Sequence, residues 1–123
     1  MGEPALVCSV HLEDEVVFEA YALERPDGNG VVLQLIGELD TLSAPALRQA
    51  FDALDPAGGP IVVDAARLGF LDSSGLVVLV SAMQDLAERG LVLRIVNPSD
   101  IVRQTVRVTG LEALFGGPDD AGS

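Results

Sequence analysis

The sequence predicts an α/β fold with one mixed sheet of about four to five strands, mostly parallel with an antiparallel edge strand, packed with about four helices. Strand-like apolar segments alternate along the chain with segments whose apolar residues recur every three or four positions, as in amphipathic helices. Of the 123 residues, 49% are hydrophobic but only 4% are aromatic. Strands rich in Val and Leu, covered by helices rich in Ala and Leu, suit this balance better than an all-β sandwich. The length suits one domain.

The first part of the chain predicts a hairpin. Residues 1–15 are acidic and weakly patterned, so we expect a frayed lead-in to a domain that spans residues 16–115. Residues 16–23 mix apolar and polar side chains in near alternation, which predicts a strand, and residues 31–36 predict a second one. Residues 25–30 between them are dense in turn formers. We expect the first of these strands to lie antiparallel at one edge of the sheet.

An amphipathic helix comes next. Thr41 or Ser43 can cap it, with Pro45 in its first turn. Residues 56–60 are rich in Pro and Gly and should break it. Its apolar residues recur at three- and four-residue steps: Ala46, Leu47, Ala50, Phe51 and Leu54.

A buried strand and a second helix follow. Residues 60–64 are almost continuously apolar, as expected of a strand covered on both faces. Residues 76–86 fit a helix with a buried face, and this helix continues to Glu88 or Arg89. Gly90 is placed to end it.

The last third of the chain predicts another strand and two helical segments. Residues 91–96 form a buried strand, and residues 97–99 start a helix that Gly110 ends. Residues 111–115 form a short helical turn, and the tail of residues 116–123 is rich in Gly, Pro and Asp and should be flexible. The expected order is therefore β-β-α-β-α-β-α-α, with right-handed parallel crossovers.

Two loops are candidates for a functional site. In open α/β sheets, sites form where strands end and helices begin, which selects residues 37–43 and residues 69–76. Asp72 and the two serines after it are favoured helix caps, so one interpretation is a capping loop worth about 1 kcal/mol. The other is a modifiable serine, because a helix N-terminus tolerates a phosphate carrying about −1.5 to −2 charges. Both stay open, and spacing does not choose between Ser73 and Ser74.

The first candidate loop contains Asp40. This loop also has a purely structural interpretation, as the end of a strand followed by a capped helix. In the functional interpretation, Asp40 flanks the Ser73 loop across the end of the sheet. Its carboxylate there accepts hydrogen bonds from a partner or repels a nearby phosphate.

The charge limits the class of partner. The formal net charge is −12, and all 7 basic residues are scattered arginines. Binding to phosphate backbones needs clustered basic residues, so we expect neither nucleic acid nor anionic membrane as a partner. A partner protein with a basic face fits better, although acidity can also serve solubility alone.

The sequence also indicates a reducing location and no catalytic chemistry of its own. Cys8 is the only cysteine, no apolar run reaches the roughly 20 residues that span a bilayer, and no signal peptide is recognisable, so we expect a cytoplasmic protein. His11 is the only histidine and lies far from Ser73 in the sequence. Neither a nucleophile elbow, nor a metal-ligand cluster, nor a phosphate-binding loop is evident, so we expect no enzyme, no metal and no cofactor.

Taken together, the chain resembles the anti-sigma factor antagonists, which share the STAS domain. The resemblance covers roughly residues 16–115, so the predicted fold is STAS-like. It rests on short segments whose order and spacing are specific as a set. They are Gly37-Glu38-Leu39-Asp40; Ala44-Pro45-Ala46-Leu47-Arg48; Phe70-Leu71-Asp72-Ser73-Ser74-Gly75-Leu76; and Val96-Asn97-Pro98-Ser99 with Thr109-Gly110-Leu111 and Leu114-Phe115.

The resemblance implies a phosphorylation switch. The unphosphorylated domain would bind an anti-sigma factor that is also a serine kinase of the histidine-kinase-like ATPase fold, and so free the sigma factor. Phosphorylation at Ser73 would release this partner, and a metal-dependent serine phosphatase would reset the domain. The chain would be a kinase substrate and not an enzyme. By the same match, the residues in or beside the contact surface are Asp40, Thr41, Asp72, Ser74, Gly75 and Leu76.

Two departures and one alternative accompany this interpretation. The family commonly has Gly where Val77 stands, and residues 1–15 have no clear counterpart in it. The alternative is a phosphorylation-independent STAS interaction module, as in stressosome scaffolds or transport complexes.

Overall fold

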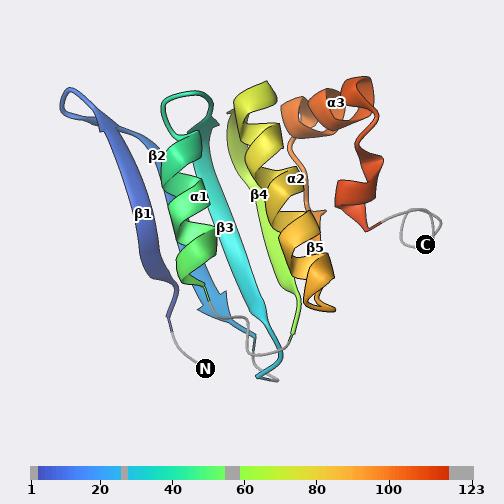
Figure 1. Cartoon of the computed structure of the whole chain (residues 1–123). Coiled ribbons are helices and arrows are strands. Elements are labelled where there is room, and N and C mark those ends of the chain that lie inside the picture. Colours follow the sequence, from blue (N-terminus) through green and yellow to red (C-terminus); the bar gives the residue numbers. More distant parts are fainter. Residues whose placement is uncertain (1–2, 26–27, 55–58, 117–123) are drawn as a thin grey trace.

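The computed structural model describes residues 3–25, 28–54 and 59–116, and within them a five-stranded sheet lies behind a pair of helices (Figure 1). The strands follow one another across the sheet in chain order, β1-β2-β3-β4-β5. The elements are β1 (Ala5–Leu12), β2 (Glu15–Glu24), β3 (Val31–Leu39), α1 (Ala44–Ala53), β4 (Ile61–Leu71), α2 (Ser73–Glu88), β5 (Leu93–Val96), α3 (Asp100–Thr109) and the 3-10 helix η1 (Glu112–Phe115).

The pairing of the strands corrects the expected topology. β1 pairs with β2 and β2 with β3 antiparallel, whereas β3 with β4 and β4 with β5 are parallel. The sheet is therefore mixed in equal parts, not mostly parallel. The described residues form three α-helices and one 3-10 turn where about four helices were expected, because the segment after Gly110 winds only as a 3-10 turn.

The N-terminal segment is a strand, so the expectation of a frayed lead-in over residues 1–15 was wrong for Ala5–Leu12. This strand is the edge of the sheet, and the strand predicted over residues 16–23 is its inner neighbour β2. Register shifts between Leu6 and Cys8 and between Val10 and His11 interrupt the alternation along β1. Such bulges hide the period of two by which a strand is recognised.

The core lies between the sheet and the pair α1 and α2, which cover the same face (Figure 1). Burial alternates along β3, where Leu33 and Leu35 are fully buried and Gln34 between them is only partly buried. This alternation is typical of a strand with one covered face. Leu47 of α1 and Leu79 of α2 reach the same core. The predicted hairpin is confirmed, since β2 and β3 pair antiparallel.

β4 is longer than the predicted strand of residues 60–64 and extends to Leu71, directly before Asp72. β3 and β4 run parallel, so their carboxyl ends meet at one edge of the sheet, where α1 and α2 begin (Figure 1). The predicted break at residues 56–60 and the predicted tail at residues 116–123 lie largely outside the described residues.

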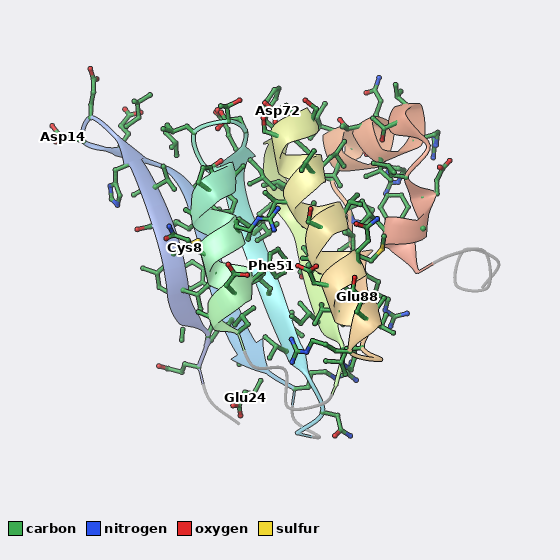
Figure 2. The ribbon with its side chains drawn as sticks, in the orientation of Figure 1. Cys8, Asp14, Glu24, Phe51, Asp72 and Glu88 are labelled. Carbon is green, nitrogen blue, oxygen red and sulfur yellow. The ribbon has the colours of Figure 1, made fainter. Side chains whose placement is uncertain are left out.

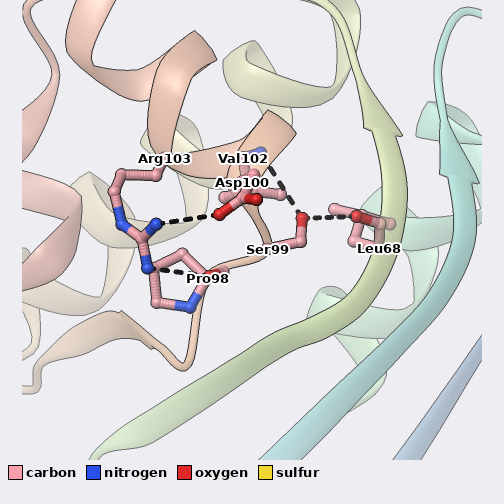
Figure 3. Close-up of polar contacts among 6 residues, drawn as sticks. All are labelled: Leu68, Pro98, Ser99, Asp100, Val102 and Arg103. Atoms are coloured by element: carbon pink, nitrogen blue, oxygen red, sulfur yellow. Dashed lines mark hydrogen bonds and ion pairs between the residues drawn. The ribbon is translucent and has the colours of Figure 1, made fainter.

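α3 is attached to β4 through Ser99 (Figure 3). The Ser99 hydroxyl donates to the carbonyl oxygen of Leu68 at 2.6 Å and accepts from the Val102 amide at 3.4 Å, so it caps the helix and ties it to the sheet. Arg103 donates to Asp100 at 3.1 Å and to the carbonyl of Pro98 at 3.3 Å. The predicted helix start is thus confirmed. Gly110 ends α3 at φ 74°, a conformation that favours glycine.

Candidate functional site

The two loops selected from the sequence meet at the carboxyl ends of β3 and β4. The Asp72 amide donates to the carbonyl of Leu39 at 3.2 Å, which joins the end of one strand to the end of the other. The hydroxyls of Thr41 and Ser74 lie 3.1 Å apart and form a hydrogen bond between the loops. Asp72 is seen at the upper end of α2 in Figure 2. The structure therefore brings both predicted loops into one surface.

Asp40 and Ser43 hold the β3–α1 loop. Oδ1 of Asp40 accepts from the amides of Leu42 at 3.0 Å and Ser43 at 3.3 Å. The Ser43 hydroxyl donates to the carbonyl of Glu38 at 2.7 Å and accepts from the Asp40 amide at 3.0 Å. Ser43 is fully buried. It occupies the predicted cap position of α1, but its side chain makes no cap hydrogen bond to that helix, because it is committed to the loop.

Asp72 confirms the capping interpretation of the second loop. Its Oδ1 accepts from the amides of Ser74 at 2.9 Å and Gly75 at 3.2 Å, two of the donors that a helix start leaves unpaired. The carboxylate therefore already occupies part of the positive end of α2 on which the phosphate interpretation relied.

The two adjacent serines differ in their surroundings. Ser73 is exposed, and among the described residues its hydroxyl has no hydrogen-bond partner. Ser74 is half-buried, and its hydroxyl is bonded to Thr41. The sequence could not make this distinction, because it depends on which way each side chain leaves the first turn of α2.

Gly75 and Leu76 lie beneath the predicted contact surface. A Cβ on Gly75 would come within 2.6 Å of Cγ of Leu39 and 2.8 Å of Cδ1 of Leu71, so only glycine lets α2 start this close to the sheet. Leu76 is 3% exposed and belongs to the core. Both residues support the site from the protein core and present no side chain at its surface.

Two exposed apolar side chains lie near the site at positions that the sequence pattern does not predict as part of it. Leu42, next to Thr41, is 51% exposed, and Val77, one helical turn after Ser73, is 59% exposed. The sequence marks Val77 only as a departure from the glycine that is common in the family. Leu42 is recognisable in the sequence as an apolar residue within a polar loop. Helix and strand periodicity does not predict the role of such a single loop residue.

The same geometry bears on catalysis and on metals. His11 lies on edge strand β1, whereas Ser73 directly follows β4. Strands β2 and β3 lie between β1 and β4, so His11 and Ser73 are on different parts of the sheet. Within residues 3–25, 28–54 and 59–116, no group of three or more His, Cys, Asp or Glu side chains could hold a metal ion. In the same ranges, every helix is too short or too polar to cross a bilayer.

Fold and site together define an α/β domain with one face of its sheet covered by helices and with a serine-bearing surface at the joined ends of two parallel strands. The family model described as "Mlab, STAS domain" matches residues 22–116 of the chain. The protein belongs to the STAS domain family.

Similar proteins include anti-sigma-B factor antagonists of two bacteria. That of Bacillus subtilis is 29% identical over 91 residues, which covers 74% of this chain and 84% of the relative. That of Listeria monocytogenes is 27% identical over 94 residues, which covers 76% of this chain and 82% of the relative.

Solved structures agree with the fold. An anti-sigma factor antagonist from Mycobacterium paratuberculosis superposes with a TM-score of 0.68 at 28% identity, covering 85% of this chain and 90% of that one. The antagonist SpoIIAA in its unphosphorylated form gives 0.58 at 28% identity, covering 76% and 84%. The Bacillus cell fate determinant SpoIIAA in its phosphorylated form gives 0.56 at 27% identity, covering 80% and 87%.

Proposed function

We propose that this STAS domain is an anti-sigma factor antagonist that phosphorylation of Ser73 switches off. The unphosphorylated form binds an anti-sigma factor and frees the sigma factor, and the phosphorylated form releases this partner. The observation that supports the choice of Ser73 is its exposed hydroxyl, which has no partner among the described residues. The hydroxyl of Ser74, in contrast, is hydrogen-bonded to Thr41. The relatives named as antagonists support the same role.

A phosphate on Ser73 would change the charge of the site without unfolding it. The group adds about −1.5 to −2 charges next to the carboxylate of Asp72. That carboxylate already accepts from the Ser74 and Gly75 amides, so these two donors are not free to neutralise the phosphate. The charge and bulk of the phosphate would therefore have to be desolvated in a contact shaped for the small, uncharged serine hydroxyl, which weakens binding even to a partner that is basic elsewhere on its docking face.

The proposed partner is an anti-sigma factor that is also a serine kinase of the histidine-kinase-like ATPase fold. In the reaction, the γ-phosphoryl group of ATP passes to Oγ of Ser73, the hydroxyl proton leaves, and ADP is released. A serine phosphatase then hydrolyses the phosphoserine. The formal charge of −12 favours a partner whose docking face is basic.

The experiment is a pull-down of the tagged full-length chain from its native host, with and without ATP, followed by phosphosite mapping by mass spectrometry. A kinase should be retained without ATP and released with it, and phosphate should appear at Ser73. Ser73→Ala should remove the main phosphorylation site and leave at most a low residual rate at Ser74, while Ser74→Ala, the matched control, should keep phosphorylation at Ser73. Phosphate incorporation that is unchanged in Ser73→Ala would refute the assignment.

A second measurement separates the switch from a constitutive binding module. Ser73→Asp should weaken the affinity for the isolated partner about tenfold, or about 1.4 kcal/mol, in calorimetry. Ser73→Asn introduces a side chain of the same size as aspartate but without its charge, and this variant should bind nearly as the wild type does. Equal affinities of Ser73→Asp and Ser73→Asn would point to the phosphorylation-independent module.

A further inference from the structure

Thr41 and Ser74 are 33 residues apart in the chain, yet their side-chain oxygens lie 3.1 Å apart, which is hydrogen-bond distance. Thr41 itself is exposed, in the loop after β3, and Ser74 is in the first turn of α2. Neither residue needs the other for the caps of the two helices, because Asp72 caps α2 and Asp40 and Ser43 hold the loop. The contact is thus additional to the hydrogen bonds that stabilise the two loops.

The contact distinguishes two hydroxyls that a kinase would otherwise find side by side. Ser73 and Ser74 are consecutive in the first turn of α2, and both lie at the same end of the sheet. Phosphoryl transfer requires the acceptor oxygen to approach the γ-phosphorus while its proton leaves toward a base. A hydroxyl held against a neighbouring loop must first break its hydrogen bond and turn outward, whereas the Ser73 hydroxyl has no such bond within the part of the chain that the structure describes.

We propose that Thr41 is a specificity-determining positioning residue, whose hydroxyl holds that of Ser74 and thereby directs phosphorylation to Ser73 alone. This inference rests on the proposed function and adds to it the physical basis for the choice between two adjacent serines. Thr41 acts through Ser74 and takes no part in the transfer itself.

The size of the effect follows from the strength of the contact. One neutral hydrogen bond in a partly exposed position is worth a factor of about 2 to 10 in an equilibrium. Removing the Thr41 hydroxyl should therefore raise the share of phosphate found on Ser74 by about that factor, while Ser73 keeps its own rate.

The test uses the full-length chain and the purified kinase that the pull-down identifies. Thr41→Val removes the hydroxyl and keeps the β-branched shape, and Thr41→Ser restores a hydroxyl and serves as the conservative control. Each is made alone and together with Ser73→Ala. The initial rates of phosphorylation at positions 73 and 74 are measured separately by mass spectrometry of site-specific peptides, with circular dichroism as a check on folding.

In the Ser73→Ala background, Thr41→Val should speed phosphorylation at Ser74 about 2- to 10-fold, and Thr41→Ser should return it to the low rate. A merely structural role for Thr41 would change both serines alike and would leave the ratio of the two sites constant. A ratio that is the same in wild type, Thr41→Val and Thr41→Ser overturns the inference while leaving phosphorylation at Ser73 intact. A wild-type chain without phosphate at either serine overturns the proposed function, and the inference with it.

Discussion

Gly75 lies against Leu39 so closely that a Cβ on the glycine would stand 2.6 Å from Cγ of the leucine. This approach joins the first turn of α2 to the end of β3, and so it sets the distance between the two loops of the site. The hydroxyl contact between Thr41 and Ser74 depends on it, because each side chain leaves from one of these two elements.

Gly75→Ala should destabilise the protein, although alanine is the better helix former. Overpacking against Leu39 and Leu71 costs about 1–3 kcal/mol, and the gain in helix propensity of about 1 kcal/mol offsets only part of it. The check is the urea midpoint of unfolding. Gly69→Ala is the matched control, because a Cβ there meets only the carbonyl of Gly37, at 3.8 Å. Equal stability of Gly75→Ala and wild type would contradict the close packing.

Substitutions of Asp72 should separate its cap from its charge. Asp72→Ala removes the acceptor for the Ser74 and Gly75 amides and should lower the free energy of unfolding by about 1 kcal/mol. Asp72→Asn keeps a good cap without the charge and should unfold close to wild type. If charge near Ser73 drives release, Asp72→Asn should also show a smaller effect of Ser73→Asp on partner affinity. An Asn variant as unstable as the Ala variant would speak against the capping role.

Ser43→Ala should loosen the β3–α1 loop from inside. The substitution removes both the donor to the Glu38 carbonyl and the acceptor for the Asp40 amide at a fully buried position. Leaving buried polar groups unpaired costs about 1–3 kcal/mol, which thermal and urea unfolding would report. The exposed Ser9 provides the control, because Ser9→Ala should change stability by less than about 0.5 kcal/mol. Similar stabilities of both variants would contradict the role of Ser43.

The reactivity of the Cys8 thiol reports whether β1 packs against the rest of the domain. Burial raises the pKa of the Cys8 thiol above its ordinary value, although the backbone of Ala20 opposes the shift. Cys8 belongs to β1 and lies on the side of this strand next to α1 (Figure 2). As the only cysteine of the chain, it should react with iodoacetamide more slowly in the folded than in the urea-unfolded protein. Equal rates would mean that β1 does not pack.

The same shift gives a pH dependence of stability. A raised pKa means that the folded protein holds the thiol proton more tightly, so the stabilisation is present below the pKa of the unfolded thiol. It is lost as the pH rises through the folded pKa. Wild type should therefore lose more stability than Cys8→Ala on alkaline titration. Tyr21, whose pKa is raised chiefly by its hydrogen bond to Glu19, is present in both proteins and cancels in the comparison. Parallel stability curves would contradict the shift.

Much of the α/β part of the fold could be predicted from local patterns. The apolar residues that recur along α1 and the turn residues between β2 and β3 carry their information within a few positions. β1 could not be predicted in the same way, because the bulges next to Cys8 and Val10 break its alternation. Its membership in the sheet is decided by pairing with β2, which a local pattern does not contain.

The features of the candidate site likewise fall into those that local sequence predicts and those that depend on the fold. Local sequence is enough to predict that Asp72 caps a helix and that two serines follow it, because capping depends on residues next to one another in the chain. The folded chain is needed to see that Thr41 holds Ser74 and that Ser73 is exposed without a partner among the described residues. The physical reason is that a hydrogen bond between residues 33 positions apart exists only after parallel β3 and β4 bring their carboxyl ends together.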